Sequence, residues 1–415
     1  SSFGKEFHIF FMEDWIFQED YTQETLNNHF QTKSLKGFGI DHLQHGSIAA
    51  GVALHYLSET QHNKLQHITT ISRIAEEEYV WMDRFTIRNL ELYQAPTANS
   101  VTLLDVIDKT ISPMGGRLLK RWLALPLKSI DKIRQRHQIV QYLSENDEII
   151  NGFKTQIKQI SDLERLISKV ATGKINPREV VLLKNSLNAI VPIKKEAAKS
   201  NNDALKVIGD RLNACDVLRE RIEQTLHEEA PVNINKGNAI ATGFSEELDE
   251  LRKLAFSGKD YLDSMLEREM KRTGISSLKI ASNNVFGYYI EVRNTHKDKV
   301  PEEWIRKQTL VNAERYITEE LKEYEAKILG AEEKIAILEQ QIFTQLVTWM
   351  HSYIQSVQTN AILIAQLDCL CGFVQLAKEN NYVLPEMDDS YDLEIEEGRH
   401  PVIEKQLPLG EAYIT

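Results

Sequence analysis

The sequence is poor in the residues that characterise disulfide-rich, membrane-spanning and turn-rich proteins. Its 415 residues include only 3 cysteines, and they form no CxxC pair, which argues against a zinc ribbon or a redox motif. The 19 glycines and 10 prolines are few for this length, which favours long helices over a turn-rich β architecture. No run approaches the roughly 18 apolar residues of a membrane span, and no signal-peptide pattern opens the chain. These absences predict a mainly helical protein of the reduced cytoplasm, with no membrane partner.

Phosphate-binding and catalytic signatures are missing as well. A P-loop requires Gly, four residues, and then Gly-Lys followed by Ser or Thr. The Gly-Lys pairs that begin at Gly4, Gly173 and Gly258 are followed by Glu, Ile and Asp, so none fits. No local Ser/His/Asp or Cys/His arrangement indicates a nucleophile. We therefore predict that this chain is not an enzyme by itself, that it has no catalytic residues and that it holds no cofactor.

The metal-ligating residue types are present but poorly placed for a metal. Histidines cluster early in the chain, at His42, His45, His55, His62 and His67. No cysteine lies near them in sequence, so helix-surface histidines are a better interpretation than a zinc site. Cys369 and Cys371 flank Leu370 in an apolar helical stretch, where free cysteine usually acts as a small hydrophobic residue. We predict no metal site and a core position for both cysteines.

Acidic residues outnumber basic ones, which limits how the chain can contact nucleic acid. Lys and Arg total 49 and Asp and Glu total 61, giving a net charge of −12. Any contact with nucleic acid must therefore come from a local patch and not from a global positive field.

The chain changes character along its length. A strand-like run, Phe7 to Phe11, and helical stretches after Asp20 and after Asp41 indicate part of an α/β module whose other strands lie outside this chain. From about residue 67 to residue 235 the pattern is helical, and Pro113 and Pro177 each suit the first turn of a helix.

Two long helices are predicted in the second half. Apolar residues keep helical spacing from Phe244 to Gly274 and again from Leu321 to Val357. At about 1.5 Å per residue these helices would be about 45 and 55 Å long. An antiparallel pair in coiled-coil contact and an ordinary helical bundle both account for these apolar stripes.

A small β island and a donor-rich stretch lie between the two helices. Residues Leu278 to Val292 have Asn283 and Asn284 as a turn signal and then a strand-like run. Residues Arg306 to Arg315 are rich in hydrogen-bond donors, as in segments that contact phosphates. Basic and acidic residues balance between Ser276 and Glu323, so a solvated polar face is an equally good interpretation.

Several motifs resemble the MutS family of DNA mismatch repair proteins. They are GYYIEV (Gly287 to Val292), RKQTLVNAERYITEELKEYE (Arg306 to Glu325), EEGRHPVIE (Glu396 to Glu404), TLLDVIDKTISPMGGRLLKRWL (Thr102 to Leu123), MDRFTIRNLEL (Met82 to Leu92) and DLERLISKVATGKINPRE (Asp162 to Glu179). The resemblance covers nearly the whole chain and keeps the order of the motifs. It implies a mainly α fold: a helical core with long antiparallel lever helices that carry a small β-rich clamp, and a partial α/β connector at the N-terminus.

The resemblance also implies a division into domains. Residues 1–61 would be the C-terminal part of the connector, residues 62–274 and 324–392 the core and levers, residues 275–323 the clamp, and residues 393–415 the start of a truncated ATPase domain. The family's mismatch-reading domain would precede Ser1, and its P-loop, Walker B motif and dimerising helices would follow Thr415. We therefore expect a middle fragment of such a protein.

Carried over residue by residue, the resemblance identifies candidate DNA-binding residues. They are Asn312, Arg306, Lys307, Arg315, Lys279 and Tyr288. Asn312 corresponds to a contact with the DNA backbone, whereas Val311 departs from relatives that often have Lys there, which removes roughly one phosphate contact. Tyr413 corresponds to an aromatic residue that stacks on adenine, in a nucleotide site that is incomplete here.

The implied function is to hold duplex DNA through its backbone and to couple ATP state to that grip. In the intact protein the resemblance implies ATP and Mg²⁺ as cofactors, mismatch-containing double-stranded DNA as ligand, a homodimer, and a MutL-type downstream partner. It places the protein in the bacterial cytoplasm, associated with the nucleoid. The alternative is a MutS-like recombination or structural protein whose clamp embraces DNA junctions.

Overall fold

The structure is a computed structural model that describes residues 11–61, 65, 67–74, 77–93, 100–283 and 287–407. Helices account for 63% of it and the strands form a small antiparallel sheet, which confirms the prediction of a mainly α protein. The chain divides into two compact units. The larger unit contains Ser1–Ile175, Leu182–Glu220 and Val347–Thr415, and the smaller unit contains Asn176–Val181 and Arg221–Leu346.

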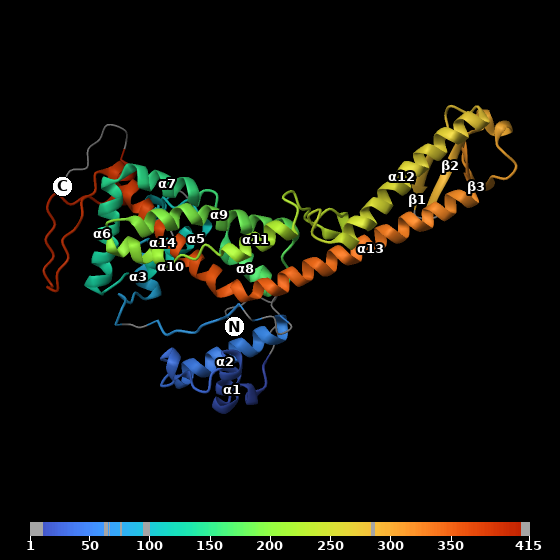
Figure 1. The fold of residues 1–415 in the computed structure, drawn as a ribbon. Coiled ribbons are helices and arrows are strands. Elements are labelled where there is room, and N and C mark those ends of the chain that lie inside the picture. The colour runs from blue at the N-terminus through green and yellow to red at the C-terminus, as the bar shows by residue number, and fades with distance from the viewer. Residues whose placement is uncertain are drawn as a thin grey trace. The chain divides into compact units, whose positions relative to one another are not determined.

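The larger unit is a helical assembly in which α14 (Ile354–Asn380) packs against α5, α6, α7 and α8 (Figure 1). Besides α14, the helices of this unit are α1 (Glu19–His29), α2 (Gln44–Gln61), α3 (Arg84–Asn89), α4 (Leu103–Ile107), α5 (Pro113–Ala124), α6 (Ile130–Glu145), α7 (Asp147–Ile157), α8 (Leu163–Ala171), α9 (Pro177–Lys199), α10 (Asp203–Arg211), α11 (Asp216–Thr225) and α15 (Pro401–Gln406). Helices α9 and α11 each have residues in the smaller unit as well. The helical segment Glu319–Asn380 includes an 18-residue stretch apolar enough to cross a membrane by composition, and 72% of that stretch is buried inside the protein. Such burial is typical of a core helix.

Several local predictions for the helices are confirmed. Helices α5 and α9 begin at Pro113 and Pro177, in the first turn, where the missing N–H of proline is tolerated. Cys369 and Cys371 are buried in α14, as expected for small hydrophobic residues. Burial raises the pKa of Cys371 to about 12, so the thiol stays protonated and unreactive at neutral pH.

Residues 11–61 form a helical pair with a core of its own. Helices α1 and α2 pack together over Leu26, Leu35 and Leu54, and they match the two helices expected after Asp20 and Asp41. The strand expected over Phe7 to Phe11 lies outside the described residues except for its last residue.

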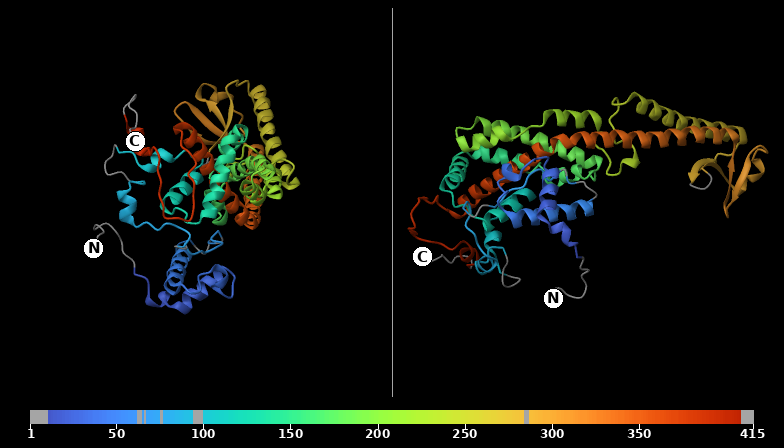
Figure 2. Two further views of the ribbon diagram at one scale, coloured as in Figure 1. Left: turned by 90° about the vertical axis from the view of Figure 1, so that its left-hand side faces the viewer. Right: turned by 90° about the horizontal axis from the view of Figure 1, so that it is seen from below.

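The smaller unit contains α12 (Glu246–Thr273) and the first part of α13 (Glu319–Met350). Figures 1 and 2 show the two helices side by side and antiparallel, with the sheet where α12 ends and α13 begins. Ser245 Oγ accepts a hydrogen bond from Leu248 N at 3.3 Å and so caps α12, and Gly274 ends it in a left-handed conformation that favours glycine. The predicted bounds of α12 are confirmed. The second predicted helix, Leu321 to Val357, begins near the start of α13, but it runs across a 3₁₀ turn (His351–Tyr353) that separates α13 from α14.

Side chains of α12 and α13 meet along the pair. The Tyr261 and Tyr324 rings stack with centroids 3.7 Å apart, and Arg268 pairs with Glu320 at 2.6 Å. Leu262 and Ile328 belong to an apolar cluster that the two helices share with the sheet. The antiparallel pair is therefore the correct interpretation for α12 and α13, while the bundle interpretation describes α14.

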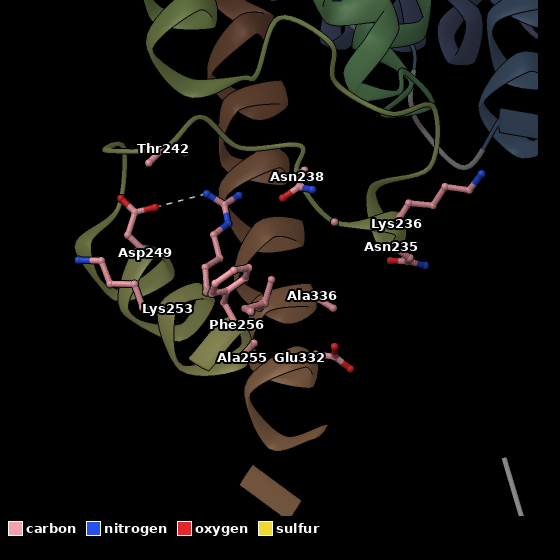
Figure 3. Close-up of a pocket in the computed structure, with 13 residues that line it drawn as sticks. Asn235, Lys236, Asn238, Thr242, Asp249, Lys253, Ala255, Phe256, Glu332 and Ala336 are labelled. Carbon is pink, nitrogen blue, oxygen red and sulfur yellow. Dashed lines mark hydrogen bonds and ion pairs between the residues drawn. The ribbon is translucent and has the colours of Figure 1, made fainter. Parts of the chain in front are cut away.

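A buried ion pair holds the other end of the pair, where α12 begins. The Glu339 carboxylate is fully buried and lies 2.7 Å from the Arg252 guanidinium. It also accepts hydrogen bonds from the amides of Asn238 and Ala239 at 3.1 and 3.3 Å. A pocket of about 880 Å³ opens there, lined by α12, α13 and the loop through Asn238 (Figure 3).

The sheet has four antiparallel strands in the order β1-β2-β4-β3. They are β1 (Lys279–Asn283), β2 (Gly287–Arg293), β3 (Ile305–Thr309) and β4 (Ala313–Ile317). The sequence predicted one strand-like run, which corresponds to β2, but β1 ends at Asn283 before it and the donor-rich stretch supplies β3 and β4. A 3₁₀ segment, Asn294–Lys299, follows β2.

Candidate nucleic-acid interface

The register of the sheet separates its two faces. Ile290 and Val292 are buried in the cluster shared with α12 and α13, so Glu291 between them faces away from the helices. On that outer face Glu291 lies directly opposite Lys279 of β1 and Arg315 of β4. Two of the predicted DNA-binding residues are thus brought to one face, with a glutamate between them.

Arg315 is fixed in place by its neighbours. Its guanidinium lies over the Tyr289 ring, 4.4 Å from the centroid, and donates to Glu291 at 3.3 Å and to Gln308 at 2.8 Å. A cation that already has a carboxylate partner contributes less positive potential than an unpaired one. Arg315 therefore presents a guanidinium of fixed orientation on a polar surface.

Arg306 lies on edge strand β3 and is also paired. Its guanidinium donates to Glu314 at 3.2 Å, and the Tyr316 hydroxyl donates to the same carboxylate. The Tyr316 hydroxyl and then the charge of Arg306 lower the pKa of Glu314, while burial and the bond to Glu314 raise the pKa of Tyr316 to about 12. Glu314 is therefore ionised at neutral pH and orients Arg306.

The turn between β3 and β4 presents Asn312 to solvent. Asn294 holds this turn, since its side-chain amide donates to Val311 O at 2.9 Å and its backbone amide donates to Asn312 O at 3.1 Å. The Val311 side chain is 92% exposed. Lys307 sits nearby at an irregularity in the β3–β4 pairing and is exposed. Sequence reasoning missed Asn294, because nothing local to it indicates a bond to a residue 17 positions away.

Tyr288 lies apart from the other candidates. It packs against the apolar cluster on the helix-facing side of the sheet, and its backbone amide donates to Glu325 of α13 at 3.1 Å. The Glu325 carboxylate occupies the space that a side chain at Gly287 would need, and Gly287 has a φ of +70°. This explains the glycine that precedes Tyr288, and it separates Tyr288 from Lys279 and Arg315.

Ion pairs change the charge balance that the composition suggests. Arginines of α12 pair with acids of this region: Arg272 with Glu303, and Arg268 with Glu320. Among the residues that the structure describes, the cations between 276 and 323 without an ion pair are Lys279, Arg293, Lys297, Lys299, Lys307 and Lys322, and the corresponding acids are Asp298, Glu302 and Glu319. Unpaired cations therefore outnumber unpaired acids. Sequence reasoning missed the two α12 arginines because they lie outside the β segment.

Tyr413, the expected adenine-stacking residue, lies outside the described residues. Within the described part of the chain, no three His, Cys, Asp or Glu side chains converge as metal ligands would.

Comparisons with known proteins assign most of the chain to two named domains. A family model described as MutS domain II matches residues 5–69, and one described as MutS domain III matches residues 85–373. Proteins named DNA mismatch repair protein MutS are 70% identical in Christiangramia forsetii, 68% identical in Flavobacterium johnsoniae and 54% identical in Bacteroides fragilis. Each alignment spans 414 residues and covers 100% of this chain and 48% of the relative. The chain thus spans about half the length of these relatives.

Proposed function

The chain belongs to the MutS family of DNA mismatch repair proteins, and from that premise we propose that its four-stranded sheet holds duplex DNA by contacts to the phosphate backbone. One observation carries the proposal: acids near the sheet are neutralised by arginines of α12, which leaves an excess of unpaired cations around the sheet. Lysines and arginines that neutralise phosphates supply most of the sequence-independent affinity for DNA.

The candidate residues divide into two kinds of contact. Lys279 and Lys307 have no carboxylate partner among the described residues and are exposed, so they suit direct pairing with phosphates. Arg306 and Arg315 are oriented by Glu314 and Glu291, and donate to phosphates from fixed positions. Asn312 adds a neutral donor at the tip of a turn that Asn294 holds. Such contacts position the protein without reading bases.

We assign the domains on the same basis. Residues 1–61 form part of the connector, residues 62–274 and 324–392 the core and levers, residues 275–323 the clamp, and residues 393–415 the start of the ATPase domain. In the whole protein, ATP and Mg²⁺, a homodimer and a MutL-type partner complete the activity, which couples ATP state to the grip on mismatched DNA. Tyr413 would stack on adenine there. The site of action is the bacterial cytoplasm, at the nucleoid.

A MutS-like protein of recombination, whose clamp embraces DNA junctions, is the second candidate. The match of residues 5–69 to MutS domain II favours the repair function, because shorter relatives of the recombination type lack the connector.

Duplex binding across a salt series tests the backbone-contact assignment. The double variant Lys279→Gln with Lys307→Gln should bind matched and mismatched duplexes more weakly by the same factor. The slope of log affinity against log salt should fall in magnitude by about 2, because each phosphate contact contributes about 0.9. Asn312→Ala should weaken both duplexes equally without changing the slope.

The matched control is Lys195→Gln with Lys199→Gln, the same charge change at exposed positions of α9 in the larger unit. An equal loss of slope in this control would show that net charge alone governs binding. A loss restricted to mismatched DNA would contradict contact through the backbone.

A further inference from the structure

A second polar pocket lies in the larger unit. It has a volume of about 670 Å³ and is walled by α5, α6, α10 and α14 together with Tyr79. Segment 78–80 closes one side by pairing with residues 126–128, through Val80 N to Pro126 O at 2.7 Å and Lys128 N to Glu78 O at 2.9 Å. The volume lies within the range of small-molecule sites, roughly 300–1,000 Å³.

Arg136 of α6 is the unusual residue of this pocket. Its guanidinium carbon lies 3.5 Å from the centroid of the Trp122 ring. Among the residues that the structure describes, no carboxylate pairs with it and no acceptor takes a hydrogen bond from it. Burial lowers the pKa of Arg136 to about 10, which leaves it charged at neutral pH. A half-buried cation whose donors are unused is costly, and contact with an indole offsets only part of that cost.

The charged groups around Arg136 balance one another, so the pocket keeps the single positive charge of Arg136. Arg211 of α10 is exposed and also lines the pocket, whereas Lys132 lines it but pairs with Glu78 at 2.9 Å. Asp203, at the start of α10, supplies one carboxylate on that wall. Apolar side chains such as Val207 and Leu370 complete the lining. The pocket therefore combines a cationic group with an apolar wall.

We propose that this pocket binds a small organic molecule that carries a carboxylate or phosphate, with the Arg136 guanidinium as its anchor. The planar fork of N–H donors on arginine matches two oxygens of either group, and the bond between opposite charges strengthens where water is displaced. The apolar wall accepts the body of the ligand. This site is separate from the proposed DNA contacts and does not require DNA.

The test measures binding of three probes to the whole chain by calorimetry: inorganic phosphate, adenosine monophosphate and citrate. Wild type should bind at least one organic probe saturably, with a dissociation constant of about 1 mM or lower. Arg136→Met should weaken that binding at least about tenfold, and Arg136→Lys should weaken it less because it keeps the charge without the fork. The matched control, Arg121→Met, removes an exposed arginine of α5 and should bind as wild type does.

Val207→Glu keeps the test decisive if Arg136 variants unfold. Val207 is 54% exposed, so the fold tolerates a carboxylate there, and the new charge should repel the probe and weaken binding. The proposal is overturned if no organic probe binds saturably at about 10 mM, or if Arg136→Met binds as tightly as wild type. Equal weakening in Arg121→Met would also overturn it, because binding would then follow net charge.

Discussion

Replacing Glu339 with Gln should loosen the base of the α12–α13 pair. Glu339 is fully buried, and its carboxylate pairs with Arg252 and accepts from the amides of Asn238 and Ala239. Glutamine keeps one acceptor oxygen but places an amide N–H₂ against these donors. It also leaves the Arg252 charge without its buried partner, and Nε of Arg252 already lacks an acceptor among the described residues. The loop through Asn238 and the start of α12 should both lose their anchor (Figure 3).

The magnitude follows from how deeply the pair is buried. Removing one partner of a buried pair costs about 3–5 kcal/mol. The Arg252 side chain keeps 20% exposure and also pairs with Asp249 at 3.4 Å, so part of its charge stays compensated, and we take the lower end, about 3 kcal/mol. That corresponds to roughly a hundredfold increase in the equilibrium constant for local opening.

Amide hydrogen exchange is the suitable assay, because two compact units need not unfold in one transition. Exchange at the first two turns of α12 and at Asn238 and Ala239 should be roughly a hundredfold faster in Glu339→Gln than in wild type. The control Glu333→Gln makes the same chemical change at an exposed position of α13 and should exchange as wild type does. Wild-type protection in Glu339→Gln would refute the reasoning, since it would mean that the ion pair does not hold the loop.

Two further predictions concern stability. The pKa of Glu314 is lowered in the folded state. The stability that its carboxylate contributes is therefore present above the unfolded pKa of 4.5 and is lost as pH falls through the folded pKa. Wild type should therefore exceed Glu314→Gln in unfolding free energy at pH 7, and the difference should shrink in acid; a constant difference across pH would exclude this linkage. Asp368→Ala should cost about 3 kcal/mol in the urea transition of the larger unit, because the buried carboxylate accepts from the amides of Ile111 and Ser112, at 2.9 and 2.7 Å, and these would be left without an acceptor. Asp389→Ala, an exposed control, should be near neutral, and equal loss in both variants would remove the special role of Asp368.

The sequence predicted the elements whose signals are local. Ser245 and Gly274 mark the ends of α12, and the apolar stripe between them has helical spacing, so its bounds were predictable. The 3₁₀ turn at His351–Tyr353 was not, because the apolar pattern continues through it. Strands β1, β3 and β4 were missed because each is 5 residues long and is defined by its partners in the ladder.

The candidate site was predictable in position but not in charge. The resemblance placed Arg306, Arg315 and Asn312 in one segment, and the structure places all three in or beside the β3–β4 hairpin. Which cations have acid partners depends on register and on contacts between distant residues, such as Arg272 with Glu303. Composition averages over such pairs and therefore gave a neutral region.

The edges of the sheet have a consequence for self-association. Open edge strands expose unpaired amides and carbonyls that invite a second chain to pair, as in aggregates. Here β1 and β3 form the edges, each is 5 residues long, and each carries an exposed lysine, Lys279 or Lys307. Lys307 also sits at the pairing irregularity, which bends the edge away from a straight template. The lysines proposed to contact phosphates thus also oppose edge-to-edge pairing of the sheet with its copies, so the same side chains serve both roles.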